Sequence, residues 1–285
     1  MQFASPTTVD EAVTLLSAAV GTAHVLAGGT DLVVQMTAGL RQPDLVVDIK
    51  RIAALNDIEY RNGAVRIGAA VCGARLNEDA RLKALWPGFV EATDLIGSMQ
   101  IQSRATPVGN LCNASPAGDS VPAMVAAGAT VTVAGPDGLR ELPVEAVPLG
   151  PGRTALASGE FITAINFPRK PPRSGEAYVR FTPRSEMDIA VVGVGVNLTL
   201  DDCGTCCAAR VAVGAVAPTV LLIEAAAQAL VGNRIEDKTL DTAAEAVRTA
   251  CRPIDDKRGS AAYRKRIAGT IFKRAVKVAL QRAQA

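Results

Sequence analysis

Two glycine-bearing turns in the first 120 residues constrain this chain more than any other feature. In the first, the apolar run 25–27 breaks into Gly-Gly-Thr-Asp at 28–31. In the second, Thr-Pro-Val-Gly-Asn at 106–110 is followed by Ser-Pro-Ala-Gly-Asp at 115–119. Glycine lets backbone N–H groups approach a ligand closely, and the start of a helix adds partial positive charge. Two such turns together predict a site for a bulky cofactor with a diphosphate group.

The composition describes a globular protein without a strong charge or membrane signal. With 285 residues, 49% of them hydrophobic, the chain can bury a core large enough for two or three subdomains. A net charge of +2 gives no field that favours nucleic acid, and no apolar run approaches the ~20 residues that span a bilayer. The first residues lack the basic and apolar regions of a secretory signal. We therefore expect a cytoplasmic protein that does not span a membrane and keeps its six cysteines reduced.

The chain has a single histidine, His24, which limits the chemistry its side chains can perform. A histidine-centred triad and a multi-histidine metal site are both excluded. Aromatic residues make up 4% of the chain, so stacking platforms for bases or sugars are scarce. The cysteine group at 203–207 lies in a predicted hairpin turn without a second cysteine pair, which favours ordinary thiols over a metal site. If the chain is an enzyme, a bound organic cofactor supplies the chemistry, and we name no catalytic residue and no metal ligand.

The pattern of apolar and polar residues predicts short strands and helices in two parts. A βαβ-like opening and further short strands lead to a linker at 169–175, which is rich in proline and basic residues. Beyond it, two strands joined by a hairpin precede three helices, as in an α+β unit. Basic residues of the last helix, Arg264 among them, are expected on its solvated face, with docking against an acidic partner subunit as the alternative. The predicted strands are 25–27, 45–49, 65–68, 130–133, 160–167, 189–200 and 210–216, and the main predicted helices are 31–36, 120–129, 221–230, 239–249 and 263–282.

Each glycine turn also has an explanation that needs no ligand. The first does not match G-x-G-x-x-G or G-x-x-x-x-G-K-[ST], so neither a Rossmann dinucleotide site nor a nucleoside triphosphatase is supported. It can equally be a tight strand-to-helix turn with Thr30 or Asp31 as the helix cap. After the second turn, Asn110 and Ser115 can hydrogen-bond a phosphate or a ribose. Asp119 can accept from a ribose hydroxyl or an adenine amine, or it can cap the helix that follows.

Taken together, the two turn regions resemble those of a known family, the flavin (medium) subunits of molybdenum-containing hydroxylases. This family includes the flavoprotein subunit of aerobic carbon monoxide dehydrogenase and the flavin domain of xanthine dehydrogenase. The likeness spans most of the chain and rests on residues 27–31, 96–98, 100–101, 106, 109–111, 114–119, 122, 184, 188–190 and 262–264. Gln102-Ser103 and Val108 depart from the Arg-Asn and the glycine that are usual there. Either φ at Val108 stays negative, or the contact of this turn with phosphate is rearranged.

The resemblance implies an α+β fold with FAD bound between its parts. In that fold, a vanillyl-alcohol-oxidase (PCMH)-type FAD-binding domain has two α/β lobes, here 1–57 and 58–172. A C-terminal α+β domain, 173–285, has an antiparallel sheet with helices. The diphosphate of FAD would lie against both turns, Asp119 would serve its ribose or adenine end, and Ile162 and Arg180 would flank the flavin. The implied cofactor-binding residues are Leu26, Ala27, Gly28, Gly29, Thr30, Asp31, Thr106, Gly109, Asn110, Ser115, Asp119, Ile162 and Arg180.

The implied activity is that of an oxidoreductase subunit that carries FAD and transfers electrons. Substrate would be oxidised at the molybdopterin cofactor of a large partner subunit, and electrons would reach FAD through [2Fe–2S] clusters of a small partner subunit. FAD would pass them to an external electron acceptor, in a complex expected to be a dimer of heterotrimers. Two alternatives stay open: a stand-alone flavin oxidase or reductase, and a non-redox nucleotide-binding module.

Overall fold

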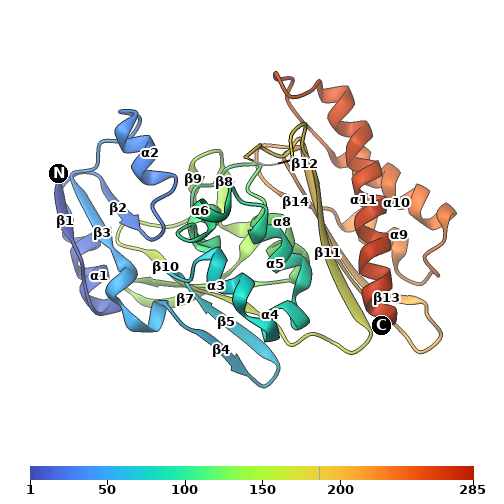
Figure 1. Cartoon of the computed structure of the whole chain (residues 1–285), viewed down its shortest axis with the longest axis horizontal. Coiled ribbons are helices and arrows are strands. Elements are labelled where there is room, and N and C mark those ends of the chain that lie inside the picture. Colours follow the sequence, from blue (N-terminus) through green and yellow to red (C-terminus); the bar gives the residue numbers. More distant parts are fainter. Residues whose placement is uncertain (186) are drawn as a thin grey trace.

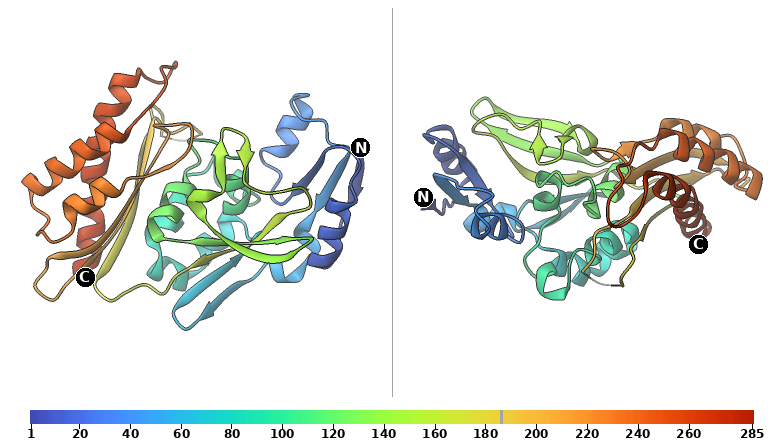
Figure 2. Two further views of the ribbon diagram at one scale, coloured as in Figure 1. Left: turned by 180° about the vertical axis from the view of Figure 1, so that it is seen from behind. Right: turned by 90° about the horizontal axis from the view of Figure 1, so that it is seen from above.

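The structure is a computed structural model that describes residues 1–185 and 187–285. Its three larger sheets follow one another along the long axis of the molecule, with the N-terminus at one end and the C-terminal helices at the other (Figures 1 and 2). Helices and mostly antiparallel strands alternate irregularly, so the predicted α+β class is confirmed. Among the described residues, no helix combines the length and the apolar character of a membrane span.

The N-terminal unit consists of β1 (Gln2–Ala4), α1 (Val9–Ser17), β2 (Ala23–Leu26), α2 (Leu32–Thr37) and β3 (Leu45–Asp48). Its strands are parallel and lie in the order β1-β3-β2, so that β2, α2 and β3 form the βαβ unit that the sequence predicts. The three-residue strand β1 is too short to show a periodicity and was not predicted. Ligands of α/β units bind at the carboxyl ends of parallel strands. The first glycine turn follows β2 at that edge.

The middle unit is built around an antiparallel sheet of five strands in the order β4-β5-β10-β6-β7, beside a small pair β8-β9. The predicted strands 65–68, 130–133 and 160–167 correspond to three of these strands, and the predicted helix at 120–129 corresponds to α8. The elements are η1 (Ile49–Arg51), η2 (Ala53–Leu55), β4 (Ile58–Arg61), β5 (Ala64–Gly68), α3 (Gly73–Glu78), α4 (Ala80–Leu85), α5 (Pro87–Asp94), α6 (Met99–Gln102), α7 (Pro107–Cys112), α8 (Ser120–Ala127), β6 (Thr130–Gly135), β7 (Gly138–Pro143), η3 (Val144–Ala146), β8 (Pro148–Gly150), β9 (Arg153–Thr154) and β10 (Phe161–Phe167).

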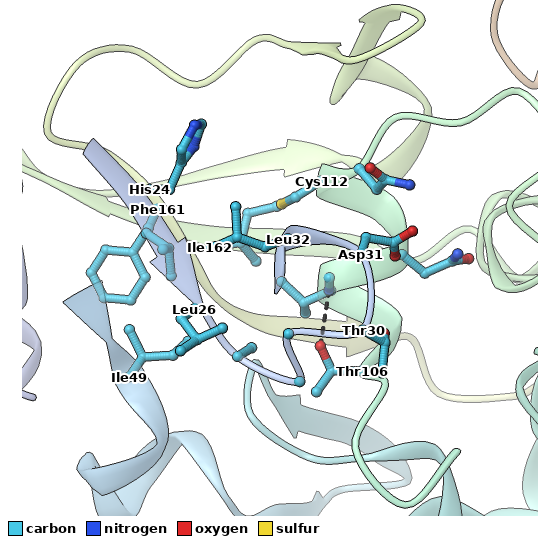
Figure 3. Close-up of a pocket in the computed structure, with 18 of the residues that line it drawn as sticks. His24, Leu26, Thr30, Asp31, Leu32, Ile49, Thr106, Cys112, Phe161 and Ile162 are labelled. Atoms are coloured by element: carbon cyan, nitrogen blue, oxygen red, sulfur yellow. Dashed lines mark hydrogen bonds between the residues drawn. The ribbon is translucent and has the colours of Figure 1, made fainter. Parts of the chain in front are cut away.

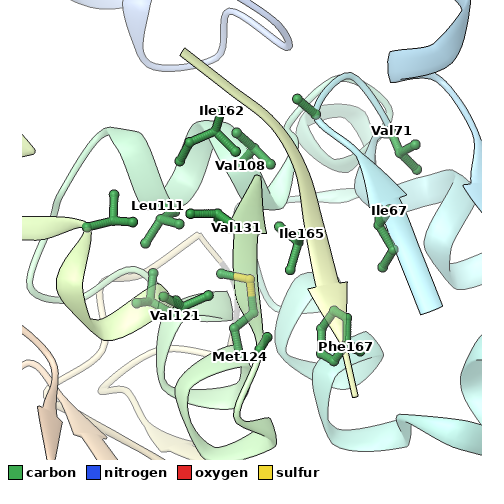
Figure 4. Close-up of a cluster of buried hydrophobic side chains, with 14 of the residues drawn as sticks. Ile67, Val71, Val108, Leu111, Val121, Met124, Val131, Ile162, Ile165 and Phe167 are labelled. Atoms are coloured by element: carbon green, nitrogen blue, oxygen red, sulfur yellow. The ribbon is translucent and has the colours of Figure 1, made fainter. Parts of the chain in front are cut away.

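Side chains of α7, α8 and the five-stranded sheet form the core of the middle unit (Figure 4). Met124 of α8 is fully buried there, together with Leu111 of α7 and Ile165 of β10. Burying a side chain of this size contributes about 1.5–3 kcal/mol. Val108 and Ile162 belong to the same core, so the packing that stabilises this unit also fixes where α7 and β10 lie.

The C-terminal unit is an antiparallel sheet in the order β11-β12-β13-β14 with three helices on its outer face (Figure 1). Its elements are β11 (Ser174–Phe181), β12 (Val192–Leu200), β13 (Cys206–Gly214), β14 (Leu221–Leu222), α9 (Glu224–Leu230), α10 (Asp237–Ala250) and α11 (Ala261–Gln284). The predicted hairpin between the two long strands is confirmed. Asp201 Oδ1 accepts hydrogen bonds from the backbone N–H groups of Cys203 (2.9 Å) and Thr205 (2.8 Å) in this turn.

Three sequence predictions in this unit need correction. The predicted linker 169–175 runs directly into β11, because Gly175 is a packing residue and not a loop residue: a Cβ there would lie 1.9 Å from the carbonyl oxygen of Ala279 on α11. The helix predicted from residue 221 begins at Glu224, since residues 221 and 222 pair with β13. Arg264 is buried and donates to the carbonyl of Val191 (2.8 Å), so it is not on a solvated helix face.

The C-terminal sheet packs on the middle unit with the face opposite α11. It contacts α8 through β12 and β13, and α5 through β11. Glycines allow this approach: a Cβ on Gly195 of β12 would lie 2.3 Å from the carbonyl oxygen of Pro122 on α8. The two units are therefore in close backbone contact.

Candidate cofactor site

A cavity of about 310 Å³ lies between the N-terminal unit and the middle unit (Figure 3). It is lined by β2, the first glycine turn, α2, α7 and the start of β10. Its size is at the lower end of small-molecule sites. Of the predicted cofactor residues, those that line it are Leu26, Ala27, Gly28, Gly29, Thr30, Asp31, Thr106, Gly109, Asn110 and Ile162, and those that do not are Ser115, Asp119 and Arg180.

The first turn presents bare backbone to this cavity. Within the described residues, the backbone N–H groups of 28–31 donate to no protein acceptor. The carbonyl of Ala27 accepts from Lys50 Nζ (3.0 Å) and that of Gly28 from Arg104 Nε (3.4 Å), which holds the turn in place. Unpaired backbone donors in a concave site are costly unless a ligand or water satisfies them. They are therefore suited to the oxygens of an anionic group such as a diphosphate.

Both glycines of the first turn are required by geometry. A Cβ on Gly28 would lie 2.1 Å from the carbonyl oxygen of Arg104, so the turn touches the chain just before α7. Gly29 has φ +80°, in the left-handed region that side-chain-bearing residues rarely adopt. The alternative explanation by a helix cap finds no support at Asp31, whose side chain makes no capping hydrogen bond although it occupies the N-cap position. Burial raises the pKa of the Asp31 carboxyl.

The second predicted turn is the first part of a helix. Pro107 starts α7, and the Thr106 hydroxyl accepts from the Gly109 N–H at 2.9 Å (Figure 3). Proline at this position suits a helix start because its missing N–H would have no helical partner. Val108 is inside this helix and is not among the described residues with left-handed φ. The first of the two alternatives for Val108 therefore holds, because its φ stays negative and the valine causes no backbone strain.

Asp119 and Arg180 form a buried pair outside the cavity lining. Asp119 occupies the N-cap position of α8 but makes no capping hydrogen bond, so the N-cap interpretation of its side chain is wrong. Its carboxylate accepts from Tyr178 Oη and from Arg180 Nη1, both at 2.7 Å, and thereby links α8 to β11. Burial raises the pKa of the Tyr178 phenol well above its usual value, so this hydroxyl stays a donor. Ser115 accepts from the N–H of Ala117 (3.3 Å).

The structure places a chain of polar side chains in the cavity that sequence reasoning missed. Arg41 Nε donates to Gln35 Oε1 (2.7 Å), and Gln35 Nε2 donates to Asn113 Oδ1 at the end of α7 (3.1 Å). The Arg41 guanidinium also lies 3.4 Å from His24 Nε2. Burial and the adjacent Arg41 charge lower the pKa of His24, so its ring is neutral at pH 7 and can accept. A lone arginine after a short helix has no sequence signature, and only the fold brings these four side chains together.

The lining also contains an apolar wall and one cysteine thiol. Leu26, Ile49, Phe161 and Ile162 form an apolar wall next to the turn (Figure 3). The Cys112 thiol lines the same cavity, and burial raises its pKa to about 12, which keeps it protonated and unreactive. This arrangement suits the binding of a large, partly apolar cofactor with a diphosphate.

Comparisons with known proteins assign this chain and its fold to one family. The model of the FAD-binding domain in molybdopterin dehydrogenases matches residues 1–170, and that of the carbon monoxide dehydrogenase flavoprotein C-terminal domain matches residues 177–279. The carbon monoxide dehydrogenase medium chain of Hydrogenophaga pseudoflava is 32% identical over 281 residues, which cover 99% of this chain and 97% of that protein. The xanthine dehydrogenase FAD-binding subunit of Escherichia coli O157:H7 is 30% identical over 260 residues, covering 90% of this chain and 89% of that protein.

Solved structures give the same assignment. Carbon monoxide dehydrogenase from Hydrogenophaga pseudoflava, in a form lacking the Mo-pyranopterin moiety of its molybdenum cofactor, superposes with a TM-score of 0.95 at 33% identity, covering 99% of this chain and 98% of that one. Quinoline 2-oxidoreductase from Pseudomonas putida 86 gives 0.92 at 26% identity, covering 100% of this chain and 98% of that one.

The fold and the site thus define an FAD-binding oxidoreductase subunit with a PCMH-type domain and a separate C-terminal domain. The chain belongs to the family of FAD-binding subunits of molybdenum hydroxylases, which includes those of carbon monoxide dehydrogenase and xanthine dehydrogenase. The family, the fold and the cofactor predicted from the sequence are confirmed.

Proposed function

We propose that this chain passes electrons from the iron–sulfur clusters of a small partner subunit to an external acceptor. A large partner subunit with a molybdopterin cofactor oxidises the substrate, and the three subunits assemble as a dimer of heterotrimers in the cytoplasm. FAD supplies the redox chemistry of this chain, and the protein's own residues bind and orient it. The observation that carries the proposal is the row of backbone N–H groups at 28–31 that line the cavity and have no acceptor among the described residues.

The residues around the cavity divide into two roles in this proposal. The backbone of 28–31 and the start of α7, with Thr106, Gly109 and Asn110, hold the diphosphate, while Leu26 and Ile162 supply apolar contact to the cofactor. For Asp119 and Arg180, the buried ion pair supports a role in holding the C-terminal unit beside the site, while the Ser115 hydroxyl accepts from the N–H of Ala117. Direct contact of these three residues with FAD stays a prediction.

We propose three structural domains for this function, 1–57, 58–172 and 173–285. The separation of the three larger sheets supports these boundaries, since the first falls between β3 and β4 and the second lies just before β11. FAD would lie between the first two domains, where the cavity is.

The test is the visible spectrum of the purified full-length chain. We expect flavin absorption bands, either as purified or after FAD is added and excess removed. The bound flavin should stay oxidised with small organic substrates alone and become reduced only when both partner subunits and a substrate are present. Colourless protein that takes up no FAD would contradict the proposal, and rapid reduction by a substrate without partners would indicate the stand-alone oxidase or reductase instead.

A further inference from the structure

Arg41 is the one arginine or lysine among the described residues that line the cofactor cavity. In the part of the chain that the structure describes, no carboxylate oxygen lies within 4.0 Å of its guanidinium nitrogens. The acids of the lining do not neutralise it, because Glu160 is paired with Arg140 at 2.6 Å, and burial alone, with no contribution from Arg41, shifts the pKa of Asp31 upward. A half-buried cation without a protein counter-charge is suited to an anionic ligand.

The local fold holds this guanidinium in a fixed position. At the end of α2 the chain turns back, and the N–H groups of Leu40 (2.9 Å) and Arg41 (3.3 Å) both donate to the carbonyl of Gln35. The Gln35 side chain then accepts from Arg41 Nε while donating to Asn113 across the cavity. On its other side, Arg41 Nη1 faces the neutral ring of His24. Arg41 is therefore held by direct contacts with His24 of β2 and Gln35 of α2, and Gln35 in turn contacts the end of α7.

These contacts leave donors available for a ligand. Arginine has five N–H donors, of which one on Nε and one on Nη1 are used, so three are left within the described structure. Two of these three belong to Nη2. A planar guanidinium matches the spacing of phosphate oxygens better than any other side chain does. In a flavin dinucleotide, the diphosphate is the group that carries full negative charge at neutral pH.

We propose that Arg41 binds the diphosphate of the dinucleotide and neutralises part of its charge, with Gln35 and His24 as positioning residues. This rests on the proposed FAD site and adds a charged contact to it, since the turn at 28–31 offers neutral backbone donors only. Arg41 then makes the cavity selective for a dinucleotide over a flavin without phosphate.

The experiment compares ligands that share or lack the diphosphate. The full-length chain is freed of flavin, and the binding of FAD, ADP and riboflavin is titrated for the natural protein, Arg41→Met and Arg61→Met. Arg61 is the matched control, because its side chain is 82% exposed and paired only with Glu59 on the surface. We expect Arg41→Met to weaken FAD and ADP binding by about 10- to 100-fold, as for the loss of a hydrogen bond to a charged group. Riboflavin binding should not change, and Arg61→Met should bind all three ligands normally.

Two results would overturn the assignment of Arg41. One is unchanged FAD affinity in Arg41→Met, and the other is an equal loss of riboflavin affinity, which would place the guanidinium against the flavin ring. If Arg41→Met does not fold, added salt on the natural protein gives a second test: it should weaken FAD and ADP binding but not riboflavin binding. A salt-independent FAD affinity would contradict the proposal. Failure of the natural protein to bind FAD at all would count instead against the proposed function.

Discussion

Gly28 and Gly29 are adjacent in the first turn, yet the structure requires glycine at each for a different reason. Gly28 permits contact with the backbone of Arg104, whereas Gly29 adopts a left-handed φ of +80°. A Cβ on Gly29 would also lie 2.9 Å from Leu26 Cδ1, on the apolar side of the turn. The shape of the first turn therefore depends on backbone conformation at both positions.

We expect Gly29→Ala to weaken FAD binding by about tenfold or more, because strain shifts the N–H groups of the turn. The matched control is Gly39→Ala, which has a similar φ of +71° but open space around it. Both variants should lose about 1–2 kcal/mol of unfolding free energy from the left-handed strain, measured by chemical denaturation. Only Gly29→Ala should lose FAD affinity, and an equal loss in Gly39→Ala would contradict the role assigned to the first turn.

Among the elements, α7 is short, and its start determines the shape of one wall of the cavity. The Thr106 cap satisfies the N–H of Gly109, and Leu111 and Val108 anchor the helix in the core. The helix α8 is linked to β11 by the hydrogen-bonded ion pair between Asp119 and Arg180. The Thr106 cap thus positions α7 at the cavity, and the Asp119–Arg180 ion pair positions α8 against the C-terminal sheet.

Thr106→Ala should lower the free energy of unfolding by about 1 kcal/mol, because the Gly109 N–H loses its cap. Thr106→Ser keeps the hydroxyl and should retain most of that stability. Urea denaturation of both variants checks this. Equal stability of the alanine and serine variants would show that the cap contributes nothing.

Asp119→Ala should destabilise the protein by about 3–5 kcal/mol, because it leaves Arg180 buried without its counter-charge. The side chains of Arg180 and Asp119 are only 6% and 9% exposed, so water cannot replace the pair. The double variant Asp119→Ala with Arg180→Met should be more stable than Asp119→Ala alone, as measured by thermal unfolding. A double variant that is less stable by the sum of the two single losses would exclude this coupling.

At the scale of the whole molecule, the contact between the middle and C-terminal units contains a buried carboxylate. Glu176 of β11 is 1% exposed and accepts from the Gly88 N–H of α5 at 2.6 Å. Burial raises its pKa to about 7, against the opposing effects of that hydrogen bond and of Lys170 and Arg282 nearby. Arg282 of α11 also donates to the carbonyl of Glu176 (2.9 Å) and pairs with Glu91 of α5.

The raised pKa of Glu176 makes stability depend on pH. The folded state holds this proton more tightly than the unfolded state does. The contribution of Glu176 to the free energy of unfolding is therefore fully present below its unfolded pKa of 4.5 and is lost as pH rises through its folded pKa of about 7. Glu176→Gln cannot ionise, so its unfolding free energy should fall less between pH 5 and pH 8, by about 1–3 kcal/mol. Denaturation curves across this range test it. A variant with the same pH dependence as the natural protein would show that Glu176 does not titrate there.

Local signals in the chain were sufficient for the elements that a short stretch of sequence defines. The Gly-Gly break after an apolar run marked the turn after β2, and Pro107 with Thr106 marked a polar turn that proved to be a capped helix start. The strand β11 was missed, because its Ser-Gly-Glu start continues a proline-rich segment and looks like a linker. Its glycine is explained only by contact with α11, which lies about 100 residues further along the chain.

The sequence by itself determined the family, the cofactor and the two turn regions that line the cavity, because backbone turns and the residues flanking them are local in the chain. Tertiary structure alone decided that Asp119 forms an ion pair with Arg180 and accepts a hydrogen bond from Tyr178, and that Arg41 lies in the cavity beside His24. Asp119 finds both partners about 60 residues away, and Arg41 contacts His24, which is 17 residues away, as well as the nearby Gln35. Which partners a buried charge finds depends on packing between units, and no local pattern of residues records it.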